Sequence, residues 1–301
     1  MIIYGMKIIS DLEFDLDLPN DIIYKDTFVL SKNIPSTLKY NLNYNTLLHT
    51  TKMHKVYLSS NQDTSQKPSR NQIFCYEIEG IAKFYWYHQD KTIYYEFLDQ
   101  DIGKFTFWFI HYFFSFFLSI ESYAVMIHAS AVEIDGKSIL FLAPYKSGKS
   151  TLAHYITKQG HKLITDDILA TFIQDNKLYY HPSHPYTNPY RQNYSLGIKV
   201  TNYKTTIDTI DMIYVLQNSF EDIPIDIKPL YGIEKFTLVR KNSLLYTKKY
   251  IRITHEKHLQ KLLENTKVFM IKRPWGTQHI PLLYKAIYKH IKQEDGTNPS
   301  S

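Results

Sequence analysis

The stretch that most constrains the fold joins an apolar strand to a helix through a short loop containing glycine and lysine. Residues 138–143 read SILFLA, and a continuous apolar run of this length predicts a buried strand. The loop PYKSG follows, and a helical pattern runs from Ser150 to about Lys158, with Gly160 as its stop signal. This strand–loop–helix order predicts an α/β fold, in which ligands gather at the carboxyl ends of the strands.

Residues 148–150, GKS, match the end of the phosphate-binding pattern G-x-x-x-x-G-K-[ST]. In such loops successive backbone N–H groups surround a phosphate while a helix N-terminus points at it. The pattern assigns the β- and γ-phosphates of a nucleotide to Lys149 and a Mg²⁺ ion to the Ser150 hydroxyl. The competing interpretation is an ordinary strand–helix turn that contains glycine. The predicted nucleotide-binding residues are Ala143, Tyr145, Lys146, Ser147, Gly148, Lys149, Ser150 and Thr151.

Ala143 stands where the pattern has its first glycine. The requirement at that position concerns the backbone, since the residue leaves the strand in a tight turn. Alanine costs little there if φ is negative, and about 1 kcal/mol or more if φ is positive. Pro144 removes one amide N–H, which the inner part of the loop does not need. We therefore expect the loop to keep its phosphate-binding role.

Two adjacent carboxylates, Asp166 and Asp167, end a second apolar run, HKLITDD, at residues 161–167. Adjacent carboxylates repel each other unless a metal ion or another cation lies between them. Phosphoryl transfer uses one acidic group for Mg²⁺ and, in kinases, a base that takes the proton of the acceptor hydroxyl. The competing interpretation is a pair of aspartates in a turn or helix cap. Because the pair follows the candidate phosphate loop so closely, we favour the catalytic role.

His128 lies in the apolar run VMIHASAV, just before the phosphate-loop strand in the sequence. A single histidine in such a strand is more often a packed core residue than a catalytic group. By itself, the residue pattern leaves both interpretations open.

The first hundred residues predict a β-rich domain. Strands are expected at 24–30 and 51–58, an exposed loop at 59–72, and an antiparallel meander at 73–78, 81–87 and 92–97. The aromatic run Phe105–Ile120 has 16 residues with a histidine inside it, short of the roughly 20 residues that cross a bilayer, so it predicts a buried helix. The predicted domains are residues 1–104, residues 105–292 and a disordered tail at 293–301.

Composition excludes few function classes. The net charge is +6 with the basic residues spread along the chain, which suits an anionic small ligand or peptide and gives little support to nucleic-acid binding. Cys75 is the single cysteine, so an intrachain disulfide is excluded and a reducing compartment is the simplest expectation. The N-terminal residues become acidic within ten positions and show no signal-peptide pattern. These features together predict a cytoplasmic protein without a membrane span.

Residues 127–168, IHASAVEIDGKSILFLAPYKSGKSTLAHYITKQGHKLITDDI, resemble the core of the HPr kinase/phosphorylase superfamily. They are more closely similar to the HPr-kinase-like proteins of bacterial biosynthetic clusters, including lasso-peptide kinases. A histidine with small residues, a glycine turn, the phosphate loop, its helix, G-H-x-L and paired aspartates occur here in the order of that family. The chain's opening, residues 4–19, and its closing segment, residues 271–287, match more weakly.

The resemblance implies an α/β kinase core of the HPr kinase and phosphoenolpyruvate-carboxykinase type, behind a β-rich N-terminal domain. It implies transfer of the γ-phosphate of ATP, with Mg²⁺, to a serine-type hydroxyl. Carried over to this sequence, Asp166 becomes the base, and Asp167 helps to hold the metal with Ser150 or to orient His128. Lys149 and His128 contact the transferred phosphate. Lys272 and Arg273 match a basic pair that touches ligand phosphates, although a solvated pair is an equal alternative.

One family signature is absent. HPr kinases carry a metal-binding glutamate before a G-L-G-I segment. In residues 193–200, NYSLGIKV, only the L-G-I part of that segment remains, at residues 196–198, and no glutamate lies nearby. This departure argues against a bifunctional HPr kinase/phosphorylase and puts HPr itself in doubt as the acceptor. The preceding stretch, residues 181–194, is rich in proline and tyrosine and suits an acceptor-binding loop, with Arg191 as its basic contact.

The leading hypothesis is a kinase whose partners are a nucleoside triphosphate and a hydroxyl-bearing peptide, protein or small molecule. The alternative is a nucleotide-binding sensor or scaffold without transfer activity, which the altered first glycine favours. A carboxykinase-type reaction is a third hypothesis, but the sequence has no dense cluster of arginines for it.

Overall fold

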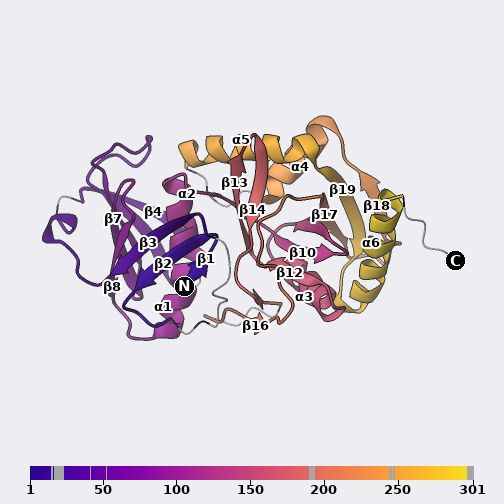
Figure 1. Cartoon of the computed structure of the whole chain (residues 1–301), viewed down its shortest axis with the longest axis horizontal. Helices are drawn as coiled ribbons and strands as arrows, with labels where there is room; N and C mark the ends of the chain where they lie inside the picture. The colour runs from indigo at the N-terminus through magenta and orange to yellow at the C-terminus, as the bar shows by residue number, and fades with distance from the viewer. Residues whose placement is uncertain are drawn as a thin grey trace. The chain divides into compact units, whose positions relative to one another are not determined.

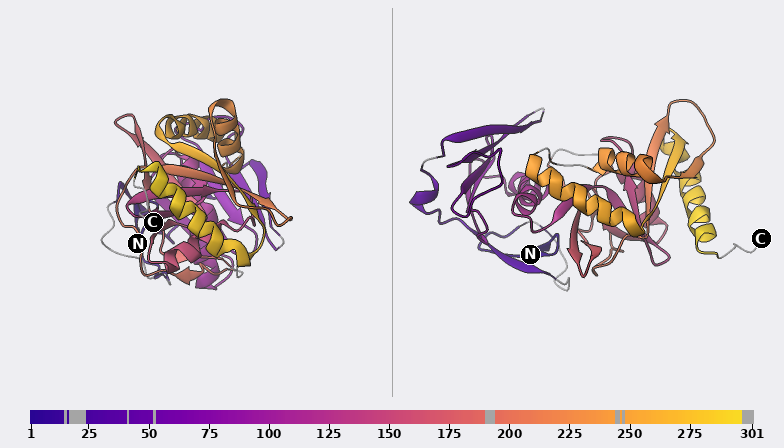
Figure 2. Two further views of the ribbon diagram at one scale, coloured as in Figure 1. Left: turned by 90° about the vertical axis from the view of Figure 1, so that its right-hand side faces the viewer. Right: turned by 90° about the horizontal axis from the view of Figure 1, so that it is seen from above.

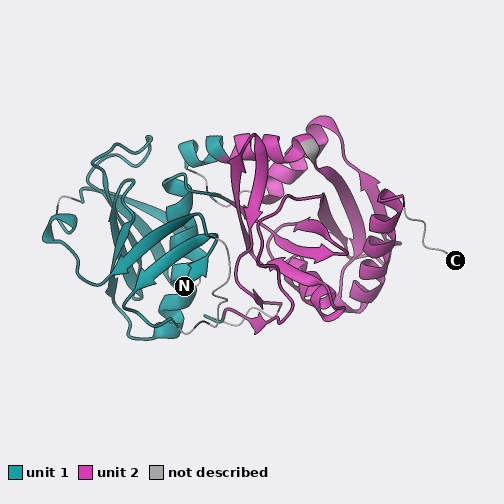
Figure 3. Cartoon of the chain, viewed as in Figure 1, with its two compact units in different colours: residues 1–125, 193–195, 246–254 teal, residues 126–192, 196–245, 255–301 magenta. Residues whose placement is uncertain are grey.

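The chain forms two compact units in a computed structural model that describes residues 1–14, 16, 24–40, 42–51, 53–189, 194–243, 246 and 248–296. Unit 1 comprises residues 1–125, 193–195 and 246–254, and unit 2 comprises residues 126–192, 196–245 and 255–301 (Figure 3). The sequence places a domain boundary between residues 104 and 105, whereas unit 1 continues to Val125. The physical reason lies in the packing of the aromatic helical segment described below.

Unit 1 is built on one eight-stranded sheet with the order β1-β2-β3-β8-β7-β6-β5-β4 (Figure 1). The predicted meander is present as three antiparallel strands, β6, β7 and β8. The strand expected at 51–58 begins only at Lys55, because Thr51 and His54 are hydrogen-bonded to each other where the chain passes from β4 to β5. The strands are β1 (Ile2–Ile3), β2 (Met6–Ser10), β3 (Asp26–Ser31), β4 (Tyr44–Thr50), β5 (Lys55–Ser60), β6 (Ile73–Ile78), β7 (Ala82–Tyr87) and β8 (Thr92–Phe97), with a short helix η1 (Ser36–Leu38).

The aromatic segment forms three consecutive helical pieces, α1 (Ile102–Trp108), the π-helical η2 (Phe109–Phe114) and α2 (Ser115–Ile120). Its phenylalanines pack on the sheet of unit 1, where the rings of Phe113 and Phe84 stack at 4.0 Å between centroids. This packing confirms the predicted buried helix and explains why unit 1 extends beyond residue 104. None of the helices in the described ranges is long and apolar enough to cross a membrane.

Glu121 ends this helical segment and ties it to the sheet. Its carboxylate, fully buried, accepts hydrogen bonds from the indole N–H of Trp86 at 2.7 Å and from the backbone N–H of Gln89 at 2.6 Å. The Nδ1 atom of His88 lies 2.8 Å from the same carboxylate. A buried carboxylate requires such partners, because an unpaired charge in the interior costs several kcal/mol.

Unit 2 is centred on a six-stranded mixed sheet with the order β12-β10-β11-β17-β19-β18. Its strands are β10 (Ser130–Ile134), β11 (Lys137–Leu142), β12 (Lys162–Thr165), β17 (Met212–Ser219), β18 (Asp226–Pro229) and β19 (Lys267–Pro274). Smaller sheets contain β9 (Val125–His128) with β13 (Ile168–Gln174) and β14 (Lys177–His181), and β15 (Tyr186–Thr187) with β16 (Ile198–Lys199). The helices are α3 (Lys149–Lys158), α4 (Gly232–Ser243), α5 (Lys249–Asn265), η3 (Thr277–His279) and α6 (Ile280–Glu294).

Strand directions bring the ends of four strands to one edge of this sheet. Strands β11, β17 and β19 are mutually parallel. Strand β12 runs in the same direction as β11, since both are antiparallel to the intervening β10. The carboxyl ends of β11, β12, β17 and β19 therefore meet the amino end of β10 at a single edge. The predicted α/β order is confirmed in this form, with α3 crossing from β11 over β10 to β12.

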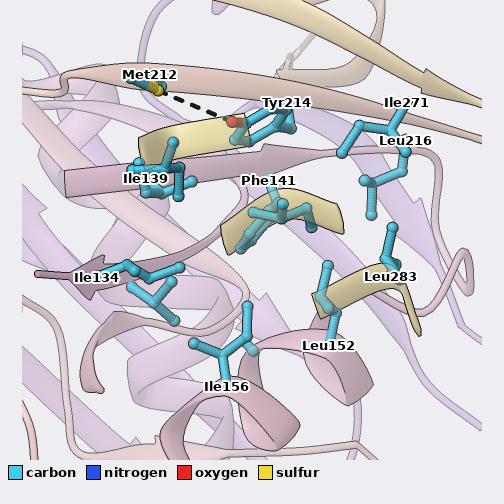
Figure 4. Close-up of a cluster of buried hydrophobic side chains, with 14 of the residues drawn as sticks. Ile134, Ile139, Phe141, Leu152, Ile156, Met212, Tyr214, Leu216, Ile271 and Leu283 are labelled. Carbon is cyan, nitrogen blue, oxygen red and sulfur yellow. Dashed lines mark hydrogen bonds between the residues drawn. The ribbon is translucent and has the colours of Figure 1, made fainter. Parts of the chain in front are cut away.

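Helices cover both faces of the sheet. Alternate residues of β11 point to opposite faces, so Ile139 and Phe141 join one core with α3 and α6, while Leu140 and Leu142 join another with α4 and α5. Figure 4 shows the first core, in which Leu152 and Ile156 of α3 lie below the strands. Helices α4 and α5 lie above the sheet in Figure 1 and face the viewer in the right-hand view of Figure 2.

Several predicted elements differ in their limits. The apolar run containing His128 is two strands in different sheets, because the chain leaves β9 at His128 and enters β10 at Ser130. The run 161–167 ends as a strand at Thr165, so the two aspartates lie between β12 and β13. At the end of the chain, α6 continues to Glu294, inside the predicted tail, and residues 297–301 lie outside the described residues.

Candidate nucleotide and phosphoryl-transfer site

The loop after β11 has a backbone form suited to an anion. Lys146 has φ +61° and Gly148 has φ +83°, so two left-handed residues flank Ser147. Alternation of right- and left-handed residues turns successive N–H groups toward one side and makes an anion-binding concavity. Ala143 is absent from the residues with positive φ, and its methyl group is buried in the core beside α3. Alanine therefore causes no backbone strain at this position, although the general pattern has glycine.

Lys149 begins α3 and turns its ammonium group back over the loop. Its Nζ donates to the carbonyl oxygen of Ala143 at 2.8 Å and lies 3.4 Å from that of Pro144. It also lies 3.0 Å from Nε2 of His128. Only 5% of Lys149 is exposed. A cation held this close to the loop's start stands where a phosphate in the concavity would meet it.

His128 links Lys149 to the acidic pair. Because an ammonium group has no lone pair to accept with, Nε2 of His128 accepts from Lys149, and the ring proton is on Nδ1. That Nδ1 lies 3.4 Å from a carboxylate oxygen of Asp167. Asp167 has φ +88° and a side chain that is one-third exposed. The three side chains thus form a continuous polar row that ends at an accessible carboxylate.

Asp166 is the buried member of the pair, with 4% exposure. It accepts hydrogen bonds from the hydroxyl of Ser130 and from the backbone N–H of Asn188 at 2.9 Å. Burial raises the pKa of Asp166, and the nearby charge of Asp167 adds to the effect, against these hydrogen bonds. The Ser150 hydroxyl, in the first turn of α3, lies close enough to Asp166 to lower its pKa slightly.

Arg273 closes the loop from the opposite side. Its Nη2 donates to the carbonyl oxygen of Ser147 at 2.7 Å, and its guanidinium carbon lies 5.9 Å from the ring centroid of Trp275. A Cβ atom at Gly148 would come within 2.9 Å of Nη2, so glycine is needed both for its φ and for this approach. Arg273 is 1% exposed, and burial lowers its pKa to about 10. It remains a cation at neutral pH.

The remaining predicted contacts are placed less closely. Lys272 is exposed, while its neighbour Arg273 is buried, because successive residues of β19 point to opposite faces. Tyr145 is 60% exposed, and the Nζ of Lys146 lies 5.7 Å from the centroid of its ring. Thr151 is partly buried in the first turn of α3. Arg191 lies outside the described residues.

The stretch expected to bind an acceptor is largely internal where it is described. His181, His184 and Thr187 are almost fully buried. The retained Leu-Gly-Ile segment has a structural role here, because Gly197 packs so closely on Thr187 that a Cβ atom would overlap its carbonyl group. This contact holds the chain next to Asn188, whose N–H bonds to Asp166.

The sequence does not predict four residues that contribute to the site: Ser130, Asn188, Asn218 and Trp275. Ser130 carries a weak signal, since it follows His128 by two residues. Asn188 acts through its backbone N–H, which any residue other than proline supplies. Asn218 lies near the end of β17 and Trp275 follows β19, and only the strand order brings these two residues to the loop.

These residues fit a magnesium nucleotide. Two cations, Lys149 and Arg273, touch the concave loop, and the Nε atom of Arg273 is buried without a hydrogen-bond partner among the described residues. The Ser150 hydroxyl beside Asp166 suits Mg²⁺, which keeps several waters and takes one or two protein ligands together with substrate phosphates. The described part of the chain contains no group of three or more His, Cys, Asp or Glu side chains arranged for a metal ion.

Comparison with protein-family models gives no match, and no curated protein matches the sequence. Among solved structures, the chain is similar to the Hpr(Ser) kinase/phosphatase from Coxiella burnetii, at 17% identity, with a TM-score of 0.37. The similarity covers 57% of this chain and 93% of that one. At this level it assigns neither a family nor an activity to the chain.

Proposed function

We propose that unit 2 is an ATP-dependent kinase core that transfers the γ-phosphate to a hydroxyl group of a peptide, protein or small molecule. One observation carries the proposal: a phosphate-type loop and an acidic pair meet at one sheet edge and are joined by a histidine. Lys149 reaches Asp167 through His128. An ordinary strand–helix turn has no reason to bury a lysine and an arginine against its backbone carbonyls.

The loop holds the substrate's phosphates. Backbone N–H groups around Ser147 and the N-terminus of α3 face the concavity, and Lys149 and Arg273 neutralise phosphate charge. Ser150 and Asp166 would hold a Mg²⁺ ion together with the phosphates, and that ion would supply further charge neutralisation. Positioning and electrostatic stabilisation account for most catalysis in phosphoryl transfer, and these residues provide both.

The different burial of Asp166 and Asp167 suggests a different role for each. Asp166 has its two oxygens engaged by Ser130 and Asn188, and it is 4% exposed, so an incoming hydroxyl has little access to it. Asp167 is accessible and is oriented by His128. We therefore assign the base role to Asp167 and the metal-side role to Asp166, which exchanges the roles expected from the sequence.

The reaction then follows from the geometry. The acceptor oxygen bonds to the γ-phosphorus, and the bond from that phosphorus to the β–γ bridging oxygen breaks in line. The hydroxyl proton passes to Asp167, and ADP leaves with the electron pair of the broken bond. Lys149 faces the charge that develops on the phosphoryl oxygens.

Labelled ATP tests the proposal. Wild-type protein with Mg²⁺, [γ-³²P]ATP and a library of serine-containing peptides and hydroxyl metabolites should yield a labelled acceptor. Asp167→Asn should lower kcat about 10²- to 10⁴-fold while ATP affinity is kept, as expected for the loss of a base. Asp166→Asn should instead weaken Mg²⁺-dependent ATP binding. Tight ATP binding without transfer to any acceptor would favour the alternative, a nucleotide sensor or scaffold.

A further inference from the structure

The order of strands around β11 determines how a nucleotide would be oriented in the proposed site. The acidic pair and His128 lie on the β10–β12 side of the phosphate loop. Strands β17 and β19 end on the other side, and their register pairs Ser219 with Pro274. Because the transferred phosphate must face the acidic pair, the rest of the nucleotide extends toward the ends of β17 and β19.

Two exposed aromatic residues follow these strand ends. Trp275 and Phe220 come one residue after the last register pair, and the N–H of Trp275 donates to the carbonyl oxygen of Ser219 at 2.7 Å. Phe220 is 94% exposed and Trp275 is 40% exposed. Large aromatic side chains are usually buried, since burial of one is favourable by a few kcal/mol, so exposed ones beside a ligand loop indicate a contact surface.

The Trp275 ring is fixed against the phosphate loop. Its Cζ3 atom lies 3.6 Å from where a Cβ of Gly148 would stand, and the guanidinium of Arg273 lies near the ring. The neighbouring Asn218 approaches the loop carbonyl of Ser147 with its Nδ2 at 3.4 Å. Its Oδ1 is buried and has no hydrogen-bond partner among the described residues. An unpaired buried acceptor is costly, and an amino group on a ligand would satisfy it.

We propose that Trp275 and Phe220 form the base-binding subsite of the nucleotide, on which the aromatic ring of the nucleobase stacks. The inference rests on the proposed nucleotide site and deepens it by naming what holds the part of the substrate that the phosphate loop does not touch. A nucleobase fits this surface because it is flat, aromatic and joined to the phosphates by a short sugar. Stacking on an aromatic side chain accepts every base, so affinity for nucleoside triphosphates depends on Trp275 whichever base they carry.

Inorganic tripolyphosphate separates this subsite from the loop, because it carries the phosphates without sugar or base. Binding of Mg-ATP and of Mg-tripolyphosphate is measured calorimetrically for the wild type, Trp275→Ala and Phe220→Ala. Tyr231→Ala serves as the matched control, since Tyr231 is 74% exposed and follows β18, which ends at the opposite edge of the sheet. Trp275→Phe keeps an aromatic ring at the site.

Trp275→Ala should weaken ATP binding by about 5- to 150-fold and leave tripolyphosphate binding within about 2-fold of wild type. Phe220→Ala should act in the same direction, while Trp275→Phe and Tyr231→Ala should remain close to wild type. Equal losses for ATP and tripolyphosphate, or no loss for either, would overturn the subsite. If the wild type binds neither ligand, the proposed function itself fails.

Discussion

Two glycines at opposite ends of α3 offer a matched test of the phosphate loop. Gly148 has φ +83° and Gly160 has φ +94°, so alanine is strained at both positions. A Cβ at Gly160 meets no atom within 4 Å, whereas a Cβ at Gly148 would stand 2.9 Å from Nη2 of Arg273. Any difference between Gly148→Ala and Gly160→Ala therefore reports the contact between the loop and Arg273.

The magnitudes follow from these contacts. A left-handed alanine costs about 1–2 kcal/mol, which lowers the melting temperature of a domain of this size by roughly 2–8 °C, and Gly160→Ala should show that much. Gly148→Ala should lower the free energy of unfolding by a further amount of about 1.5–3 kcal/mol, because the displaced guanidinium of Arg273 loses its 2.7 Å hydrogen bond to the carbonyl oxygen of Ser147. The distorted N–H groups of the loop should also weaken ATP binding at least about 10-fold.

Thermal unfolding and calorimetric titration with Mg-ATP measure both effects. Gly160→Ala should bind ATP like the wild type despite its lower melting temperature. The reasoning would be refuted if the two variants had the same melting temperature and the same ATP affinity, since the close approach of Arg273 to Gly148 would then have no energetic consequence.

Three further predictions concern buried ionisable groups. Burial raises the pKa of Asp166 in the folded protein. The stability that this carboxyl contributes is therefore present below the ordinary aspartate pKa of about 3.9 and is lost as pH rises through the folded value. Asp166→Asn should melt at a higher temperature than the wild type at pH 7 without nucleotide, and the difference in melting temperature should shrink toward pH 4. Burial lowers the pKa of His255 to about 4, so the stability that the neutral imidazole contributes is present above pH about 6.5 and is lost as pH falls through 4. The melting temperature of His255→Gln should therefore fall less between pH 7 and pH 4 than that of the wild type. An equal fall in the two proteins would contradict this. Glu121→Ala leaves the indole N–H of Trp86 and the backbone N–H of Gln89 unpaired, and it should destabilise unit 1 by about 2–4 kcal/mol in denaturant unfolding. Glu121→Gln keeps one acceptor and should cost about half as much. Equal costs for the two variants would show that these hydrogen bonds do not stabilise the unit.

The sequence predicts those parts of the site that are set by local pattern. The apolar run before residue 144, the glycine and lysine at 148 and 149, and the helix after them are all local signals, and each has its counterpart in the structure. Ala143 has no positive φ, in keeping with the general preference of non-glycine residues for negative φ.

The contacts that long-range pairing creates could not be predicted. Asn188 meets Asp166 beside the close contact of Gly197 with Thr187, and Trp275 after β19 meets Gly148 after β11, although β17 lies between these two strands. Burial separates the two aspartates, which are equivalent in the sequence, into an enclosed carboxylate and an accessible one. The π-helical turn within the aromatic segment is likewise a product of packing, as no proline or glycine marks it.

The central claim is that residues 143–151 bind the phosphates of a nucleotide through Lys149. Calorimetric titration of the full chain with Mg-ATP, in the wild type and in Lys149→Ala, tests it most directly. The wild type should bind one ATP per chain saturably and require Mg²⁺, and Lys149→Ala should lose at least about 100-fold in affinity, because a buried charged hydrogen-bond donor to phosphate is removed. Absence of binding in the wild type, or equal affinity in the two proteins, would contradict it.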